Sequence, residues 1–147
     1  MRTLPVIYAA FCAGILVGLS FVATPAKFLA ANVELADLLA VGRATFRVSM
    51  ILQLALFLPL IALSAWRRFA ATGLIALLAV QYFVLLPPLD NATLLRMQGE
   101  ATSSGWLHST WALIDGFKVV MLLAIAWSER PARKNLHERD KHCRAEP

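Results

Sequence analysis

One apolar stretch of the sequence carries the residues best suited to chemistry. The stretch from Trp106 to Trp127 is long enough to cross a bilayer, yet it contains His108, Asp115 and Lys118. A charge near the centre of such a span costs roughly 2.5–3.5 kcal/mol on insertion scales, so it normally faces protein or water and has a partner. On a helix, Asp115 and Lys118 share one face, and His108, seven residues before Asp115, belongs to the same stripe. The sequence therefore predicts an intramembrane polar stripe formed by these three residues.

The pair in this stripe has two interpretations. Asp115 and Lys118 could form an ion or proton relay, or a binding pocket near the middle of the membrane. They could instead neutralise each other and hold the helices in register, which is a structural role. Gln53 and Gln81, which are polar residues inside other apolar stretches, are expected to hydrogen-bond between helices. The sequence leaves both interpretations of the pair open.

His108 raises a separate possibility. A histidine near the end of a span can be a metal ligand or a proton acceptor, or it can be a satisfied interface residue. The other two histidines, His137 and His142, lie in the C-terminal tail and are expected across the bilayer from it. A single histidine does not make a metal site, and the sequence identifies no cofactor. A membrane redox or metal-binding subunit that uses His108 is therefore an alternative function.

A second polar group falls on the opposite side of the membrane from the tail. It consists of Lys27, Arg43, Arg47 and Asp90, all near the ends of apolar stretches. Arg43 and Arg47 are four residues apart, so they share a helix face, and either could pair with Asp90. The same arginines could bind an anionic headgroup or substrate.

The rest of the chain predicts an all-α fold, a four-helix transmembrane bundle. The chain is 59% hydrophobic, well above the roughly 45–50% typical of soluble domains. The four expected spans make up a transmembrane domain over residues 1–129, followed by a basic cytoplasmic tail over residues 130–147. The first span is expected to be a retained helix, because it is longer than the apolar core of a signal peptide. The spans are Leu4–Ala23, Val48–Trp66, Phe69–Leu89 and Trp106–Trp127.

The connections also carry patterns. Residues 24–47 alternate as an amphipathic helix does, starting from an expected N-cap at Thr24, which predicts a short helix between spans one and two. Its second half could instead extend span two outward. Gly14 and Gly18 have a spacing that lets another helix approach closely, which predicts close packing inside the bundle in preference to dimerisation.

Prolines and one glycine predict where helices bend or stop. Pro59 is expected to kink span two, and Pro87 with Pro88 to end span three. Asp90 or Asn91 would then cap a short helix that ends at Gly99.

The basic residues set the expected topology. With four spans, nine Lys and Arg residues fall on the side of both termini and four on the other side, with Lys118 inside the membrane. The positive-inside rule then places both termini in the cytoplasm of a multi-pass protein of the bacterial inner membrane. Its formal net charge of +5 is thus interpreted as a topology signal. The expected partner of the protein is the lipid bilayer, and no nucleic-acid partner is expected.

Several segments resemble a known family. The chain is similar to small four-span bacterial inner-membrane proteins of unknown function, and more loosely to eukaryotic four-span proteins implicated in metal or metallodrug tolerance. The resemblance implies a membrane fold and location, and it supplies no reaction. It is carried by Phe21–Phe28, Val41–Phe46, Leu86–Asp90 and the residues Ser104, His108 and Lys118.

We therefore expect a non-enzymatic inner-membrane protein that handles an ion or small solute through the polar stripe. A second alternative is a structural accessory subunit of a membrane complex. Four short helices enclose little space, so transport would need a homo-oligomer or a membrane-complex partner.

Overall fold

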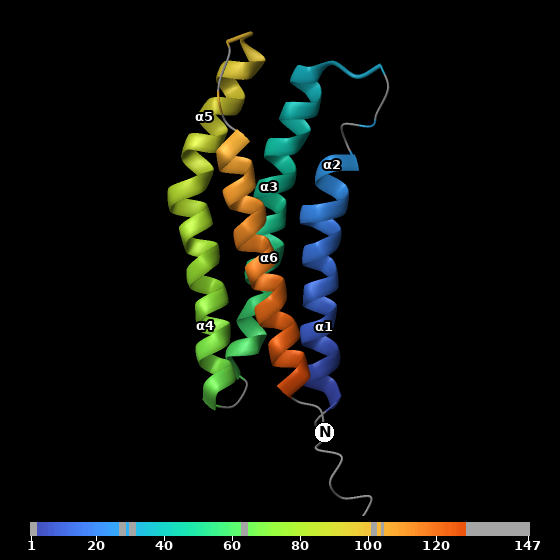
Figure 1. The fold of residues 1–147 in the computed structure, drawn as a ribbon, viewed down its shortest axis with the longest axis vertical. Helices are drawn as coiled ribbons and strands as arrows, with labels where there is room; N and C mark the ends of the chain where they lie inside the picture. The colour runs from blue at the N-terminus through green and yellow to red at the C-terminus, as the bar shows by residue number, and fades with distance from the viewer. Residues whose placement is uncertain are drawn as a thin grey trace, which may run out of the picture.

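Four long helices, each antiparallel to the next along the chain, form a bundle (Figure 1). This computed structural model describes residues 3–26, 29, 32–62, 65–100, 103 and 105–128. Lys27, Ser104 and the expected basic tail lie outside the described residues. The prediction of an all-α four-helix bundle is confirmed.

Three of the four helices change geometry along their length. The first consists of α1 (Thr3–Val17), the π-helical η1 (Gly18–Ala23) and α2 (Thr24–Ala26). The second is α3 (Leu35–Phe57) and the 3₁₀-helical η3 (Leu58–Ala62). The third is α4 (Ala65–Val80), the π-helical η4 (Gln81–Leu85) and α5 (Leu86–Met97), and the fourth is α6 (Gly105–Ser128).

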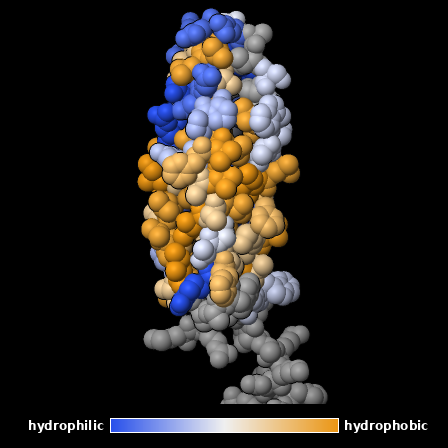
Figure 2. Space-filling model, turned by 90° about the vertical axis from the view of Figure 1, so that its left-hand side faces the viewer, coloured by the Kyte–Doolittle hydropathy of each residue, from blue (hydrophilic) through white to orange (hydrophobic). Residues whose placement is uncertain are grey.

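The outside of the bundle is built for contact with lipid. All four helices are long and apolar enough to cross a membrane. Large apolar side chains such as Ile51, Phe83 and Leu113 are at least 70% exposed, and burial in hydrocarbon rather than water makes such exposure favourable. Figure 2 shows the α4–α5 face with a broad hydrophobic band and hydrophilic residues above it. The chain is therefore a multi-pass membrane protein.

Two apolar clusters fill the inside of the bundle. One surrounds Leu16, Phe57, Leu74 and Leu122, near the end where α1 begins. The other surrounds Trp111 and includes residues of α3, α4, α5 and α6, near the opposite end. On α6, the two polar residues Asp115 and Lys118 separate Trp111 from Leu122, so a polar layer lies between the clusters.

The connection between the first two spans follows the second of its two interpretations, in which the latter half of the amphipathic pattern extends span two outward. Helix α3 begins at Leu35, so the amphipathic residues 35–47 are the outward first half of span two. Thr24 does not cap a new helix, because its Oγ1 donates 3.0 Å to the backbone oxygen of Leu19 within the continuous first helix. The amphipathic pattern is explained by a helix whose end rises above the apolar band.

The third span also differs from the prediction, since it does not stop at Pro87 and Pro88. The two prolines open α5, directly after the π-helical η4. A proline lacks the N–H that a regular helix needs, and a widened turn before it accommodates this loss. Asp90 therefore lies inside the helix and does not cap it. Gly99, with φ of 86°, ends the helix as predicted.

Two backbone predictions remain, one for Pro59 and one for Gly14 with Gly18, and they have different outcomes. The second span changes from α-helical to 3₁₀ geometry at Leu58, beside Pro59, where the sequence predicted a kink. The packing predicted for Gly14 and Gly18 is wrong: both are exposed, and no atom lies within 4 Å of a Cβ built on either one. Their face of the first helix is on the outside of the bundle.

Candidate functional site

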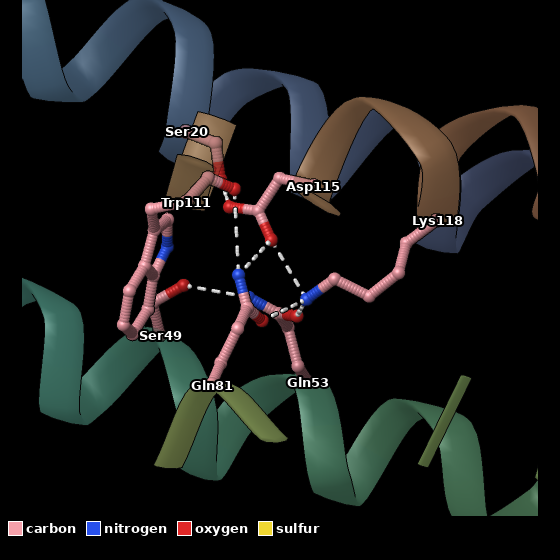
Figure 3. Close-up of polar contacts among 7 residues, drawn as sticks. All are labelled: Ser20, Ser49, Gln53, Gln81, Trp111, Asp115 and Lys118. Carbon is pink, nitrogen blue, oxygen red and sulfur yellow. Dashed lines mark hydrogen bonds and ion pairs between the residues drawn. The ribbon is translucent and has the colours of Figure 1, made fainter. Parts of the chain in front are cut away.

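A polar layer crosses the middle of the bundle and joins all four spans (Figure 3). It lies inside the apolar part of the chain, where every unpaired polar group is costly. We use the name polar layer for the side chains of Ser20, Ser49, Gln53, Gln81, Asp115 and Lys118.

Lys118 is the centre of the layer. Its side chain is completely buried, and its Nζ lies 2.7 Å from Oδ1 of Asp115. The same nitrogen donates to Oε1 of Gln53 at 2.5 Å and to Oε1 of Gln81 at 2.6 Å. An ammonium group has three N–H donors. The three oxygens therefore match a charged lysine, and a neutral amine would leave one oxygen without a donor.

Asp115 has a matching set of donors. It is also completely buried, and its Oδ1 accepts from Gln81 Nε2 at 3.0 Å as well as from Lys118. Its Oδ2 accepts from the hydroxyl of Ser20 at 2.5 Å. An ionised carboxylate only accepts hydrogen bonds, so this environment suits the charged form.

Ser20 differs from the other partners of Asp115. The Gln81 amide nitrogen and the Lys118 ammonium can only donate, whereas a serine hydroxyl can both donate and accept. If Asp115 took up a proton on Oδ2, the hydrogen bond to Ser20 could reverse, with the carboxyl O–H donating to Oγ. Ser20 is therefore the partner through which this carboxylate can gain a proton without losing a hydrogen bond.

The two glutamines connect the charged pair to the other helices. Gln81 Nε2 also contacts the backbone oxygen of Trp111, at 3.5 Å, and Gln53 Nε2 donates to Ser49 Oγ at 3.1 Å. Gln53 and Gln81 are 2% and 0% exposed, so both amides depend on these partners. The expected hydrogen bonds between these glutamines and another helix are present, since Gln81 donates to Asp115 and Gln53 accepts from Lys118.

The π-helical segments place two members of the layer. Ser20 lies in η1 and Gln81 is the first residue of η4. Each segment ends two residues before a proline, Pro25 or Pro87. Single π-helical turns inside α-helices are frequent at functional sites, because the extra residue redirects a side chain. The prolines and the polar layer are thus linked through the backbone geometry of spans one and three.

His108 lies apart from the buried pair. It is exposed, on the first turns of α6, and its ring centroid is 6.1 Å from that of Phe46. The buried face of α6 runs through Leu107 and Trp111 to Asp115 at intervals of four residues, so its neighbour His108 points away from the bundle axis. The structure brings together two residues of the predicted stripe and separates the third from them.

The second predicted polar group forms an ion cluster near the end of the bundle. Asp90 Oδ1 accepts from Arg43 Nε at 3.1 Å, and Asp90 Oδ2 accepts from Arg47 Nη2 at 2.5 Å. We call Arg43, Arg47 and Asp90 the arginine cluster. The fourth predicted member, Lys27, is outside the described residues. The sequence left open which arginine would pair with Asp90, and both do.

Two members of the polar layer were missed by sequence reasoning, namely Ser20 and Ser49. Serines are common in membrane helices and often bond their own backbone, so neither stood out. A usable signal for Ser20 was its place five residues before Pro25 inside an apolar run.

A metal site has no support from the geometry of the described residues. Within those ranges, no group of three or more His, Cys, Asp or Glu side chains is arranged to hold a metal ion. Cys12 is buried in the apolar cluster near the start of α1.

Comparisons with protein-family models, curated proteins and solved structures found no match to this chain. The family resemblance noted from the short segments therefore stays a prediction, and the function has to be argued from the site.

Proposed function

We propose that this protein is a bacterial inner-membrane protein that takes up and releases protons at Asp115 as part of handling an ion or small solute. The observation that carries the proposal is a charged pair at 0% exposure whose carboxylate has one partner, Ser20, able to accept as well as donate. Ionisable residues inside a membrane are costly and typically mark ion or proton pathways. The proton is the smallest cargo, and so it suits a closed site.

An open, mostly apolar pocket touches the polar layer at Ser49. It has a volume of about 320 Å³ and lies between the first two spans, where its lining includes Leu19, Thr45 and Ser49. A space of this size holds water if enough polar partners are available. Because Ser49 belongs to the polar layer, water in this pocket would contact the layer at Ser49, which Gln53 and Lys118 connect to Asp115.

The proposed resting state pairs the two charges. Lys118 acts as the counter-ion that Asp115 uses when no proton is bound. Protonation of Asp115 removes the charge that Lys118 faces and leaves a buried cation with neutral oxygens, which is an unfavourable state. The free energy stored in this state can drive a rearrangement of the helices. Since the pair is fully buried, a larger cargo would have to move along a surface shared with a second copy or a partner protein.

The orientation is part of the same proposal. Both termini lie in the cytoplasm, as the distribution of Lys and Arg favours, and the arginine cluster then faces the outer side. The four candidate spans of the described residues put the two ends of the described chain on one side, and the Lys and Arg distribution is what favours the cytoplasm for that side.

A structural role is the second candidate, and one observation favours it. Each of the three Lys118 donors has an acceptor, and the layer ties together all four spans, as expected of a buried network that fixes helix register. In that case the protein would act as an accessory subunit, and the pair would keep its charges throughout.

Proteoliposomes separate the two candidates. The purified protein is reconstituted into vesicles that contain a pH-sensitive dye. An acid pulse is applied outside while potassium and valinomycin hold the membrane potential constant. We expect wild-type protein to carry protons inward, Asp115→Asn to reduce the rate to that of protein-free vesicles, and Asp37→Asn, an exposed aspartate on α3, to leave it unchanged. Equal rates for wild-type and Asp115→Asn vesicles would refute proton handling and favour the structural role.

A further inference from the structure

A groove on the outside of the bundle lies apart from the polar layer. It runs between α3 and the continuous helix of α4, η4 and α5, and its volume is about 670 Å³. Sites for small molecules are typically about 300–1,000 Å³, so the groove is large enough to hold a ligand. Most of its lining is apolar, including Met50 and Leu54 on one side and Leu78 and Phe83 on the other.

The groove opens toward the lipid. Phe83 is 73% exposed, Ile51 is 70% exposed, and both line it within candidate membrane spans. From Arg47 to Leu54 the groove follows seven residues of α3, which is about 10 Å of helix. An apolar channel of this length on the membrane face suits part of an acyl chain.

One end of the groove carries a positive charge. Arg47 lines the groove, and within the described part of the chain its hydrogen-bond partner is Asp90 alone. Its side chain is 57% exposed, and a guanidinium group has five N–H donors. Two arginines share one carboxylate in the arginine cluster, so the cluster keeps a net charge of +1. Arg47 therefore has donors and charge available for an anion.

We propose that this groove binds one anionic phospholipid. The phosphate contacts the guanidinium of Arg47, and one acyl chain lies along Met50, Leu54 and Leu78. Arginine matches the geometry of phosphate oxygens because its N–H groups form a planar fork. Charge complementarity at the end of an apolar groove favours an anionic lipid over a zwitterionic one. This inference is independent of proton handling at Asp115.

Native mass spectrometry tests the headgroup contact. Wild-type protein and two variants are extracted from vesicles of equal parts phosphatidylglycerol and phosphatidylcholine, and the lipids retained per protein are counted. We expect wild type to retain one phosphatidylglycerol, and Arg47→Gln to bind it about five- to ten-fold more weakly. The matched control is Arg96→Gln, an exposed arginine on α5 outside the groove, which should bind as wild type does.

A second pair of variants tests the acyl-chain contact. Ala79 lines the groove, and Ala76 is an exposed residue of the same helix outside its lining. We expect Ala79→Phe to fill the groove and remove the retained lipid, and Ala76→Phe to leave it in place. Both positions lie at the bundle surface, so both variants should fold.

Three results would overturn the proposal. Equal retention of the two lipids by wild type would remove the charge preference. Equal loss in Arg47→Gln and Arg96→Gln would show a general effect of surface charge. Retention of phosphatidylglycerol by Ala79→Phe at the wild-type level would place the lipid outside the groove.

Discussion

The side chain of Lys118 illustrates how a charge is held inside a membrane protein. Its three oxygen partners come from α3, η4 and its own helix, so no single span satisfies it. Breaking a buried pair by removing one partner typically costs about 3–5 kcal/mol, whereas replacing both partners costs much less. The network therefore makes a specific prediction about paired substitutions.

We expect Lys118→Gln to destabilise the protein more than the double variant Asp115→Asn with Lys118→Gln. The single variant leaves a buried, uncompensated carboxylate, and the double variant leaves only neutral groups that can still hydrogen-bond. Thermal unfolding in detergent, followed by circular dichroism, measures the difference. A double variant that loses the sum of the two single losses would contradict a direct coupling between the charges.

Ser20 should matter for both stability and proton exchange. Ser20→Ala removes a hydrogen bond to a charged group, so we expect a loss of about 1.5–3 kcal/mol and slower proton entry in the vesicle assay. Ser20→Thr keeps the hydroxyl and should restore the rate. The control is Ser109→Ala, because Ser109 Oγ bonds Gly105 on its own exposed turn. Normal proton entry in Ser20→Ala would exclude Ser20 as the entry point.

At the residue scale, the sequence predicted what spacing and chemical type can reveal. Asp115 and Lys118 were found because charges three residues apart inside an apolar span are rare and must pair. His108 was assigned to the same stripe by its seven-residue spacing, but the packing of Leu107 and Trp111 sets the buried face there. Ser49 joins the layer only through the position of Gln53, which depends on how α3 packs.

At the scale of elements, the prolines had a different effect from the one that was predicted. Local rules stop a helix at Pro87 and Pro88, because each proline removes one backbone hydrogen bond. The structure continues through them after a π-helical turn, as it also does at Pro25. In a bilayer, ending a helix exposes several backbone groups, which costs more than adjusting one turn. That context cannot be seen from a window of local sequence.

The end of the third span offers a test of backbone geometry. Gly99 has φ of 86°, while Gly105 opens α6 with an ordinary helical backbone, and neither has an atom near an added Cβ. We expect Gly99→Ala to destabilise the protein by about 1 kcal/mol through left-handed strain alone. Gly105→Ala should leave stability unchanged or slightly higher. Equal melting temperatures for the two variants in the same detergent would argue against a required glycine at 99.

At the scale of the whole molecule, the apolar band and the four spans followed from composition, while the internal order did not. Two apolar clusters with a polar layer between them need contacts from all four helices, such as Ser20 with Asp115, which are 95 residues apart. Periodicity gives the buried face of one helix but not its partner on another. Close packing of Gly14 and Gly18 inside the bundle was predicted wrongly for the same reason.

Cysteine labelling in intact bacterial cells tests the proposed orientation. Gln98 is exposed at the turn after α5, and Cys143 lies in the tail. We expect a membrane-impermeant maleimide to label Gln98→Cys, in a Cys143→Ser background, without permeabilisation. Wild-type Cys143 should react only after the cells are permeabilised. The reverse pattern would place the arginine cluster in the cytoplasm.

The most direct test of proton binding at Asp115 is infrared difference spectroscopy of the reconstituted protein during a pH titration. We expect a carboxylic-acid C=O band to develop reversibly in wild type as the pH is lowered, to shift in Ser20→Ala, and to be missing in Asp115→Asn. These results would show that the buried carboxylate exchanges a proton while the bundle stays folded. A wild-type spectrum with no band that Asp115→Asn removes, at any pH where the protein is folded, would contradict the account and leave the pair as a permanent structural link.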